Sequence, residues 1–581
     1  MVINYPAQLL WEYDMENVKD EAKKVIRELG ELESKRRPLE RVWQKIYELV
    51  DPANAFITIE YSAEEILRDD LYSTAALRSL PKFVAALQST VTPPNEQWHR
   101  LMPPTRKLKK DSKCIAYLEN CTEDLFEMRY RPAAGFNKAI IKIWHGYAKI
   151  GLGCMFVDEA KDGSGSVYSA INMKDFYPVL YSNGQIKKCF HKMKKDYWEL
   201  CEELEDKGVN PAEVIPERLQ QRFKKKPNDK LKIVHYVEKL SRKEIAENMI
   251  NIKAADGSIT KIKRKYRFYL ILNEGNQPVV LNSGFFFTCP YMFTRYQELD
   301  NDIYSNSPSI QGSSDISMLQ RMRKSVIETA EKSVDPTILA KNDAELGGVQ
   351  PVAGAIIAGG LDENGRPNLQ ALNVSGSASL GVDLEELITK GIEDFYLVPL
   401  YMMYYQNKDM TATEINQRAM ERAMLMSINV FPVENELLSP MAERELDIME
   451  RCRKLPEKMP DELQEFLNND QPFYVIQYEG EQHKAQELIK ANGLMTTFQG
   501  LATLSQYEPA ISQAPKAYRC LQTLARANGA PMDHFKDEND YQQAADAYNA
   551  AQQAAAVDLK TAETAGISAD RYSAQLAQMG Y

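Results

Sequence analysis

The stretch "SDISMLQRMRKSVIETAEKSVDP", residues 314–336, predicts a long charged helix with a single apolar side. Its apolar residues recur three or four positions apart, which places them in one stripe on an α-helix. These are Ile316, Leu319, Met322, Val326, Ala330 and Val334. Asp335-Pro336 ends the helix, because proline cannot continue it.

One subunit cannot bury so narrow a stripe alone, so a large interface between identical neighbours is expected. The residues predicted to form this subunit interface are Leu319, Met322, Val326 and Ala330. The alternative is that they face the subunit's own core. An acidic substitution at Met322 or Val326 would then unfold the monomer rather than disrupt assembly.

Residues 336–381 are rich in glycine and other small residues, as in "AELGGVQPVAGAIIAGGLDENGRP". This composition predicts a compact insert of loops and short strands rather than a core. Small residues permit close backbone approach and strand pairing. A shorter helix, 383–397, follows the insert.

A second long helix is predicted to begin at Thr411. Its spacing to Glu414 matches a capping box, in which each side chain satisfies a backbone N–H at the helix start. The apolar pattern continues to about Arg453. Pro432 and Pro440 lie inside it, so the helix is expected to be kinked.

Between these helices lies "LVPLYMMYYQNKD", residues 397–409, an aromatic segment that is unfavourable to leave in water. One interpretation is a loop that faces another molecule, carried by residues 404–409. The other is that residues 401–405 pack under the long helix, which is the favoured interpretation for Tyr401 and Met402.

The rest of the chain predicts an α+β protein that is predominantly helical. Helical patterns cover about 15–50, a segment that ends at Pro93-Pro94, 112–129 and 134–150. From 165 to 300 the pattern is that of strands, with a Ser-Asn-Gly hairpin signal at 182–184. Residues 541–581 form an Ala/Gln-rich helical tail, either packed in a ring or solvated.

Bulk composition excludes several classes of protein. At 581 residues the chain is too long for one core. A net charge of −11 argues against a protein that coats nucleic acid through a basic surface. The N-terminus lacks a signal-peptide pattern, and the most apolar stretch is too short to span a bilayer. Eight cysteines without a Cys-x-x-Cys pair indicate reduced, buried thiols.

Catalytic and metal-binding motifs are missing from the sequence. It contains no phosphate-binding loop, no His-Glu-x-x-His, no Gly-x-Ser-x-Gly and no dinucleotide-binding glycine motif. "DGSGS" and "DNDIYSNS" lack the ligand spacing of a calcium loop. We therefore expect no enzyme activity, no catalytic residues, no cofactor and no metal site.

In order, these elements resemble the portal, or head-to-tail connector, proteins of short-tailed tailed bacteriophages. The stretches that carry the resemblance are "LPKFVAALQSTVTPPNEQWHRL" (80–101), "PYMFTRYQELDNDIYSNSPSIQGSSDISMLQRM" (290–322), "ETAEKSVDPTILA" (328–340), "MTATEINQRAMER" (410–422), and "YEGEQHKAQ" with "LARANGAP" (within 478–531). The resemblance covers about residues 10–555 and is weakest over 195–265.

The resemblance implies a portal fold with named parts. They are a wing (1–313) with a long kinked wing helix (413–454), two stem helices (314–335 and 382–398), a clip (336–381), a channel loop (399–412), a crown (455–540) and a helical tail that could form a barrel (541–581). The loop residues expected to face DNA, without base-specific pairing, are Tyr404, Tyr405, Gln406, Asn407, Lys408 and Asp409.

The same resemblance implies assembly and partners. The family forms a dodecameric ring at one capsid vertex, through which double-stranded DNA is packaged and ejected. Implied partners are the terminase large subunit, a tail adaptor, the major capsid and scaffolding proteins, and internal ejection proteins, with no membrane. The expected location is the virion, after synthesis in the host cytoplasm. The alternatives are another ring or scaffold protein of a virion, and an enzyme with an acid site.

Overall fold

The computed structural model describes residues 15–59, 71–94, 96–206, 208–225, 229–247, 249–253, 259–274, 278–299, 303–340, 361, 364–367, 369–371, 378–402, 430–452, 454–456, 459–468, 471–504, 517–527 and 541–551. The chain divides into two compact units. One contains Met1–Trp98 and Glu123–Leu455, and the other contains His99–Thr122 and Pro456–Tyr581. Helices and strands are mixed, as the sequence predicts.

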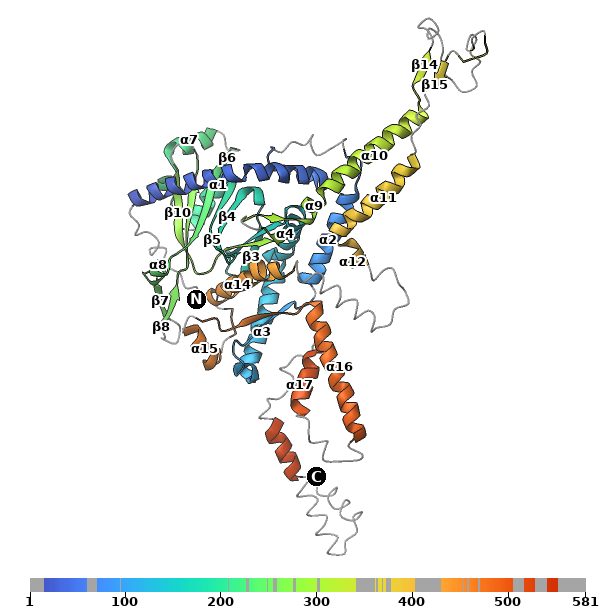
Figure 1. Ribbon diagram of the computed structural model, residues 1–581. Coiled ribbons are helices and arrows are strands. Elements are labelled where there is room, and N and C mark those ends of the chain that lie inside the picture. Colours follow the sequence, from blue (N-terminus) through green and yellow to red (C-terminus); the bar gives the residue numbers. More distant parts are fainter. Residues whose placement is uncertain are drawn as a thin grey trace, which may run out of the picture. The chain divides into compact units, whose positions relative to one another are not determined.

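A five-stranded antiparallel sheet forms one half of the first unit (Figure 1). Its strand order is β10 (Val279–Phe286), β9 (Tyr266–Leu272), β6 (Lys230–Lys239), β5 (Ile186–Asp196) and β4 (Phe176–Leu180). The predicted Ser-Asn-Gly hairpin joins β4 to β5. Gly184 has φ +79° there, in the left-handed region that glycine adopts freely.

Helix α1 (Met15–Val50) lies across this sheet (Figure 1). Its side chains Ala22, Val25 and Leu29 are buried against Phe190 and other aromatic side chains of the strands. Ion pairs flank this apolar contact, for example between Lys192 Nζ and Glu33 Oε1 at 2.8 Å. The apolar contacts and the ion pairs therefore both fix the position of α1 on the sheet.

Three helices that the strand pattern did not predict lie between β5 and β6 in the chain, although the two strands pair directly in the sheet. They are α5 (Tyr197–Asp206), α6 (Pro211–Val214) and α7 (Glu217–Lys225). Leu200, Leu204 and Ile215 from this segment pack on the β strands in one buried cluster. A short helix, α8 (Arg242–Glu247), and the hairpin of β7 (Met249–Lys253) and β8 (Ile259–Lys263) follow β6.

The other half of the first unit combines helices with a three-stranded sheet. The sheet order is β11 (Tyr291–Arg295), β2 (Leu152–Glu159) and β3 (Ser166–Ala170). The helices are α2 (Ala75–Val91), which ends before the Pro93-Pro94 pair, and α4 (Phe136–Ile150). Trp144 on α4 donates its Nε1–H to Gln88 Oε1 on α2 at 3.0 Å.

A tight turn connects α4 to β2. Gly151 has φ +73°, and a Cβ built on it would lie 1.8 Å from the carbonyl oxygen of Asn306. Only glycine fits this position, because it adopts this backbone angle freely and has no Cβ to clash with Asn306. The strands β12 (Gln297–Glu298) and β13 (Ser305–Asn306) bring Asn306 to this turn.

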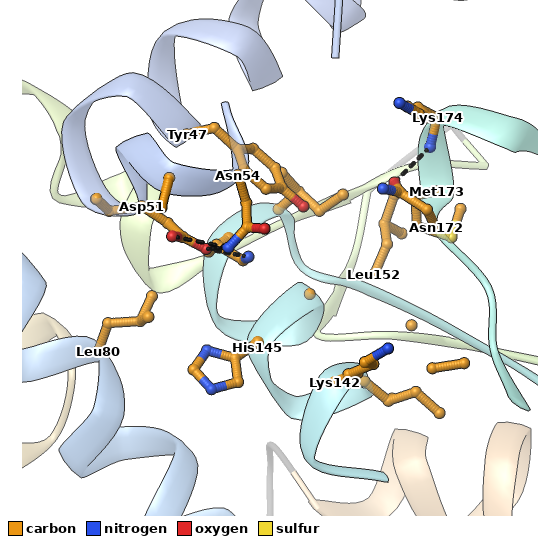
Figure 2. Close-up of a pocket in the computed structure, with 18 of the residues that line it drawn as sticks. Tyr47, Asp51, Asn54, Leu80, Lys142, His145, Leu152, Asn172, Met173 and Lys174 are labelled. Atoms are coloured by element: carbon orange, nitrogen blue, oxygen red, sulfur yellow. Dashed lines mark hydrogen bonds and ion pairs between the residues drawn. The ribbon is translucent and has the colours of Figure 1, made fainter. Parts of the chain in front are cut away.

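A pocket lies beside the C-terminal end of α1 (Figure 2). Its walls come from α1, the short helix η2 (Pro52–Asn54), α2, α4, β2 and the connection from β3 to the short helix η6 (Met173–Asp175). All of these segments belong to the first unit.

The second unit is built from segments distant in the sequence. Strand β1 (His99–Met102) pairs antiparallel with β16 (Val475–Tyr478). Arg100 forms ion pairs with Glu119 and Glu479, the second at 3.2 Å. The helices are the start of α3 (Ser112–Tyr130), α15 (Asp461–Asn468), α16 (Glu481–Leu504), α17 (Ala517–Ala527) and a helical segment over 541–551.

Candidate functional site

Two long helices form an arm that leaves the body of the first unit (Figure 1). They are α10 (Ser313–Val334) and α11 (Ala378–Phe395), which pack against each other. The predicted ranges of the two stem helices, 314–335 and 382–398, correspond to these helices within a few residues. Beyond α10, β14 (Ile338–Ala340) pairs antiparallel with β15 (Leu369–Ala371). Both strands lie within residues 336–381, where the sequence predicts an insert of loops and short strands.

Close packing joins the two helices of the arm. A Cβ built on Gly381 would lie 2.7 Å from Val326 Cγ2, so α11 approaches α10 closely at this glycine. An ion pair between Arg323 Nη1 and Glu385 Oε2, at 3.3 Å, crosses the same contact. Glu385 is buried. This close approach and the ion pair hold α10 and α11 together as one helical pair.

The base of the arm is fixed to the body. Tyr396, at the end of α11, is fully buried, and its hydroxyl lies 2.7 Å from Ser309 Oγ on the short helix α9 (Pro308–Gln311). The Tyr396 ring also meets Phe83 of α2 edge to face, with ring centroids 6.3 Å apart. Leu397 then has φ +55°, and the chain turns sharply into α12 (Val398–Met402).

Along the arm, large apolar side chains remain exposed. On α10 they are Met318 (41% exposed), Ile327 (38%) and Val334 (87%), and on α11 they are Val382 (55%), Leu384 (45%) and Leu387 (69%). Apolar surface concentrated on one element indicates contact with another protein molecule. The arm is therefore the candidate site of subunit contact.

The predicted interface residues differ in exposure. Leu319 is covered by its own subunit at 2% exposed. Met322 and Val326 are half-buried, while Ala330 is exposed. Ile316 and Leu319 on the first turns of α10 thus pack within the chain, and the later turns leave surface available. Sequence reasoning did not single out Leu384 and Leu387, although their spacing of three marks an apolar side of α11.

The predicted channel residues, Tyr404–Asp409, and the predicted helix cap, Thr411 with Glu414, lie outside the described residues. The chain is described up to Met402 in α12 and again from Val430. Helical residues from 430 lead into a π-helical segment, Glu434–Leu438, and then α14 (Ser439–Arg451). Pro440 lacks the N–H that a regular helix would use here, consistent with the local change of hydrogen bonding.

The π-helical segment is anchored to β11. Glu436 accepts a hydrogen bond from the backbone N–H of Arg295 at 2.9 Å and another from Arg295 Nε at 3.0 Å. Opposite charge and two directed hydrogen bonds make this a strong contact. It fixes the start of α14 relative to the three-stranded sheet.

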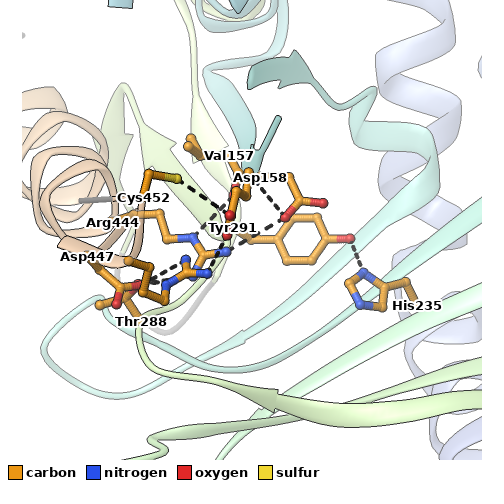
Figure 3. A network of polar contacts seen from close by, with 10 residues as sticks. Val157, Asp158, His235, Thr288, Tyr291, Arg444, Asp447 and Cys452 are labelled. Carbon is orange, nitrogen blue, oxygen red and sulfur yellow. Dashed lines mark hydrogen bonds and ion pairs between the residues drawn. The ribbon is translucent and has the colours of Figure 1, made fainter. Parts of the chain in front are cut away.

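Figure 3 shows a second anchor, in which Arg444 of α14 reaches the sheet. Its guanidinium donates to the carbonyl of Val157 at 3.3 Å and to Thr288 Oγ1 at 3.3 Å, and it pairs with Asp447 at 3.2 Å. The Arg444 side chain is almost fully buried. Each of its contacts therefore replaces water that burial has removed.

A third anchor is an ion pair that is completely buried. Arg129 Nε and Nη2 donate to the two carboxylate oxygens of Glu445, at 3.0 and 2.5 Å. Both side chains have no exposed surface, and the Tyr168 hydroxyl also donates to Glu445. Burial and the nearby Glu445 charge raise the pKa of Tyr168 well above its ordinary value. The guanidinium lies over the ring of Trp98, 4.7 Å from its centroid.

All eight cysteines are free thiols. Within the described residues, one group could in principle hold a metal ion: Asp111, Cys114 and Glu462. Burial, followed by the charge of Asp111, raises the pKa of Cys114 to about 12. Glu462 is exposed, and exposed acidic groups commonly lie near one another without a metal ion, so we assign no metal to this group. No described helix is both long and apolar enough to span a bilayer.

Comparisons with known proteins identify a family for most of the chain. A family model described as bacteriophage head to tail connecting protein matches residues 22–535. The "Probable portal protein" of Bordetella phage BPP-1 is 22% identical over 562 residues, which cover 92% of this chain and 93% of that protein. The "Portal protein" of Salmonella phage epsilon15 is 19% identical over 497 residues, or 84% of each chain.

Among solved structures, a chain of the "Virion of native gene transfer agent (GTA) particle" matches 69% of this chain and 90% of its own length. Its sequence identity is 10% and its TM-score is 0.27, a level of similarity that carries no argument about the fold. The family match spans both units and includes the whole arm. The chain therefore belongs to the family of bacteriophage head-to-tail connecting proteins.

Proposed function

We propose that this chain is the subunit of a phage portal, a ring that joins the head to the tail at one capsid vertex. The observation that carries the proposal is the connector-family match over residues 22–535. Two relatives that align with most of the chain are named portal proteins, which supports the same function. The role is structural, and we assign no catalytic step to the chain.

The finer proposal follows the family resemblance. Twelve copies form the ring, and double-stranded DNA passes through its axis during packaging and ejection. The terminase large subunit binds first and the tail adaptor later, at the clip (336–381). The capsid, scaffolding and internal ejection proteins are further partners. The wing is 1–313 with 413–454, and the crown and tail are 455–540 and 541–581.

We assign the stem to the arm. Its exposed apolar residues lie on both helices, so both helices offer surface that a neighbouring copy could cover. Of the residues proposed earlier, Met322, Val326 and Ala330 keep surface that a neighbour could cover. Leu384 and Leu387 are added because they are exposed on α11. Because these side chains are already partly buried, covering each of them contributes less than complete burial, which is worth about 1.5–3 kcal/mol.

The test combines substitution with imaging. Leu384→Gln together with Leu387→Gln should reduce the fraction of rings in negative-stain images and sedimentation velocity. Glu386→Gln, at an exposed position of the same helix that is not three or four residues from either leucine, is the matched control. Circular dichroism should be unchanged in both proteins. If the double variant forms rings as the wild type does, α11 is not the contact surface.

We also propose that residues Tyr404–Asp409 line the channel, with Lys408 approaching phosphates and Asp409 limiting their retention. Replacing these six residues by a Gly/Ser linker should leave rings intact, because Thr411 and Glu414 still cap the following helix. The retained genome length in heads that carry the replacement should fall. Wild-type retention and ejection would assign the aromatic segment to internal packing instead.

A further inference from the structure

The pocket beside α1 has a cavity volume of about 800 Å³ and walls that carry mostly positive charge. Lys142, His145 and Lys149 follow one another on α4 at spacings of three and four, which places them on one face of the helix. Lys174 comes from the η6 segment. Figure 2 shows Lys142 and His145 along one side of the pocket, with Asp51 and Asn54 across from His145.

Among the described residues that line the pocket, Asp51 is the only acid, and its carboxylate is already engaged. Lys149 Nζ lies 2.7 Å from Asp51 Oδ2, and Asn54 Nδ2 donates to both Asp51 oxygens at 3.1 and 3.0 Å. The Lys149 ammonium also lies over the Tyr47 ring, 4.4 Å from its centroid. Asp51 and Lys149 therefore neutralise each other.

Two ammonium groups keep hydrogen-bonding capacity. Lys174 Nζ donates one hydrogen bond, to the carbonyl of Phe56 at 3.2 Å, and an ammonium has three N–H donors. Lys142 is exposed and makes no ion pair within the described part of the chain. Lys174 also interacts electrostatically with the carboxylate of Asp175, which is not among the residues that line the pocket. The wall thus retains the ammonium of Lys142, which has no ion pair among the described residues, and that of Lys174, which Asp175 balances in part, in a chain whose net charge is −11.

His145 adds a group whose charge can change. Burial lowers the pKa of its imidazole, the Lys149 charge lowers it further, and Asp51 acts in the opposite direction. These effects together favour the neutral form of the ring. Binding of an anion nearby would favour the protonated ring and would raise this pKa.

We propose that this pocket binds an oxyanion, held by the ammonium groups of Lys142 and Lys174 with Asn54 and His145 beside them. The oxyanion is either free phosphate or the carboxylate of an acidic side chain from another copy of this chain. Both sources offer the same chemistry, a compact anion that accepts several charge-assisted hydrogen bonds. The site lies outside the arm and does not depend on the proposed role of the arm.

Isothermal titration of the full-length protein before it assembles, when no other copy can fill the pocket, separates the sources. The probes are inorganic phosphate and a hexaglutamate peptide. Binding of phosphate supports a free ion, and binding of the peptide alone supports a side-chain carboxylate. In either case, Lys142→Gln with Lys174→Gln should weaken binding by about tenfold or more, because it removes two charged donors.

Lys138→Gln is the matched control, since Lys138 is exposed on the same helix one turn earlier and does not line the pocket. It should leave binding unchanged, and thermal unfolding checks that both variants fold. Equal binding by the control and the double variant would overturn the proposal. So would failure of the wild-type protein to bind either probe.

The pH dependence provides a second test, with sulfate as a probe that stays divalent. Its affinity should rise as pH falls from about 8 to about 5.5, because protonation of His145 adds a positive charge beside Lys142, Lys149 and Lys174. His145→Gln should abolish most of this rise. An unchanged rise in that variant would remove His145 from the site.

Discussion

At the scale of single residues, Tyr291 connects two histidines in the interior of the first unit. Its hydroxyl lies 2.6 Å from His235 Nδ1 and 3.0 Å from His191 Nδ1. A hydroxyl donates one proton, so when it donates to one imidazole the other must donate to its oxygen. Burial, and then the charge of Lys195, lowers the pKa of His191 to about 4.

This pKa predicts a dependence of stability on pH. Between the ordinary histidine value of 6.5 and about 4, the unfolded chain binds a proton that folded His191 does not. The free energy of unfolding should therefore fall as pH decreases through this window, by on the order of 3 kcal/mol from this residue. Urea unfolding at a series of pH values measures it, and His191→Gln should flatten the dependence.

Glu434 changes the unfolding free energy with pH in the opposite direction to His191. Only the difference in pH dependence between the wild type and His191→Gln therefore reports on His191. Burial raises the pKa of Glu434 to about 7 from an ordinary value of 4.5. The folded carboxyl keeps a proton that the unfolded chain loses, so its contribution weakens stability as pH rises through that range. The same pH slope for wild type and His191→Gln would show that His191 is not responsible.

Gly151 and Gly163 provide a matched pair of left-handed glycines, with φ of +73° and +67°. A Cβ at Gly163 meets nothing within 4 Å, whereas at Gly151 it meets the carbonyl oxygen of Asn306 at 1.8 Å. Gly163→Ala should cost about 1 kcal/mol of unfolding free energy. Gly151→Ala should cost at least about 2 kcal/mol more, because the backbone must move. Chemical denaturation measures both losses. Equal losses of unfolding free energy in the two variants would contradict the close approach of Gly151 to the Asn306 carbonyl.

At the scale of elements, α14 depends on buried charges. Replacing Arg129 by Leu leaves the Glu445 carboxylate buried without its ionic partner, and about 3–5 kcal/mol of stability should be lost. Arg129→Leu with Glu445→Leu should lose less than the single variant, since neither charge then remains. Denaturant unfolding of the three proteins measures this. A double variant less stable than Arg129→Leu would mean that the pair itself, rather than the orphaned charge, stabilises α14.

Several elements could be predicted from the sequence because their signals are local. The apolar stripe of α10, the Ser-Asn-Gly hairpin and the Pro93-Pro94 stop each depend on residues close together in the chain. The helices α5–α7 were missed because 197–225 is short, charged and bounded by strands. The π-helical segment has no local signature beyond Pro440. The pocket joins segments from Tyr47 to Lys174, so only tertiary packing brings its lysines together.

At the scale of the whole molecule, like charge should oppose the proposed assembly into a ring. Each copy carries a net charge of −11, and bringing copies together concentrates it. The apolar surface of the arm is not screened by salt, while charge repulsion is. Raising sodium chloride from about 50 mM to about 500 mM should therefore shift the protein toward rings. Sedimentation velocity measures the shift, and dissociation at high salt would indicate an interface held by ion pairs.

The pairing of β1 with β16 has a consequence for synthesis on the ribosome. Met102 pairs with Val475, so the ribosome must add 373 more residues after Met102 before Val475 is present. At about 5–20 residues per second, the first strand waits roughly 20–75 seconds for its partner. An unpaired strand edge can pair with other chains during that interval. A ribosome that stops before residue 475 releases a chain whose second unit cannot be completed.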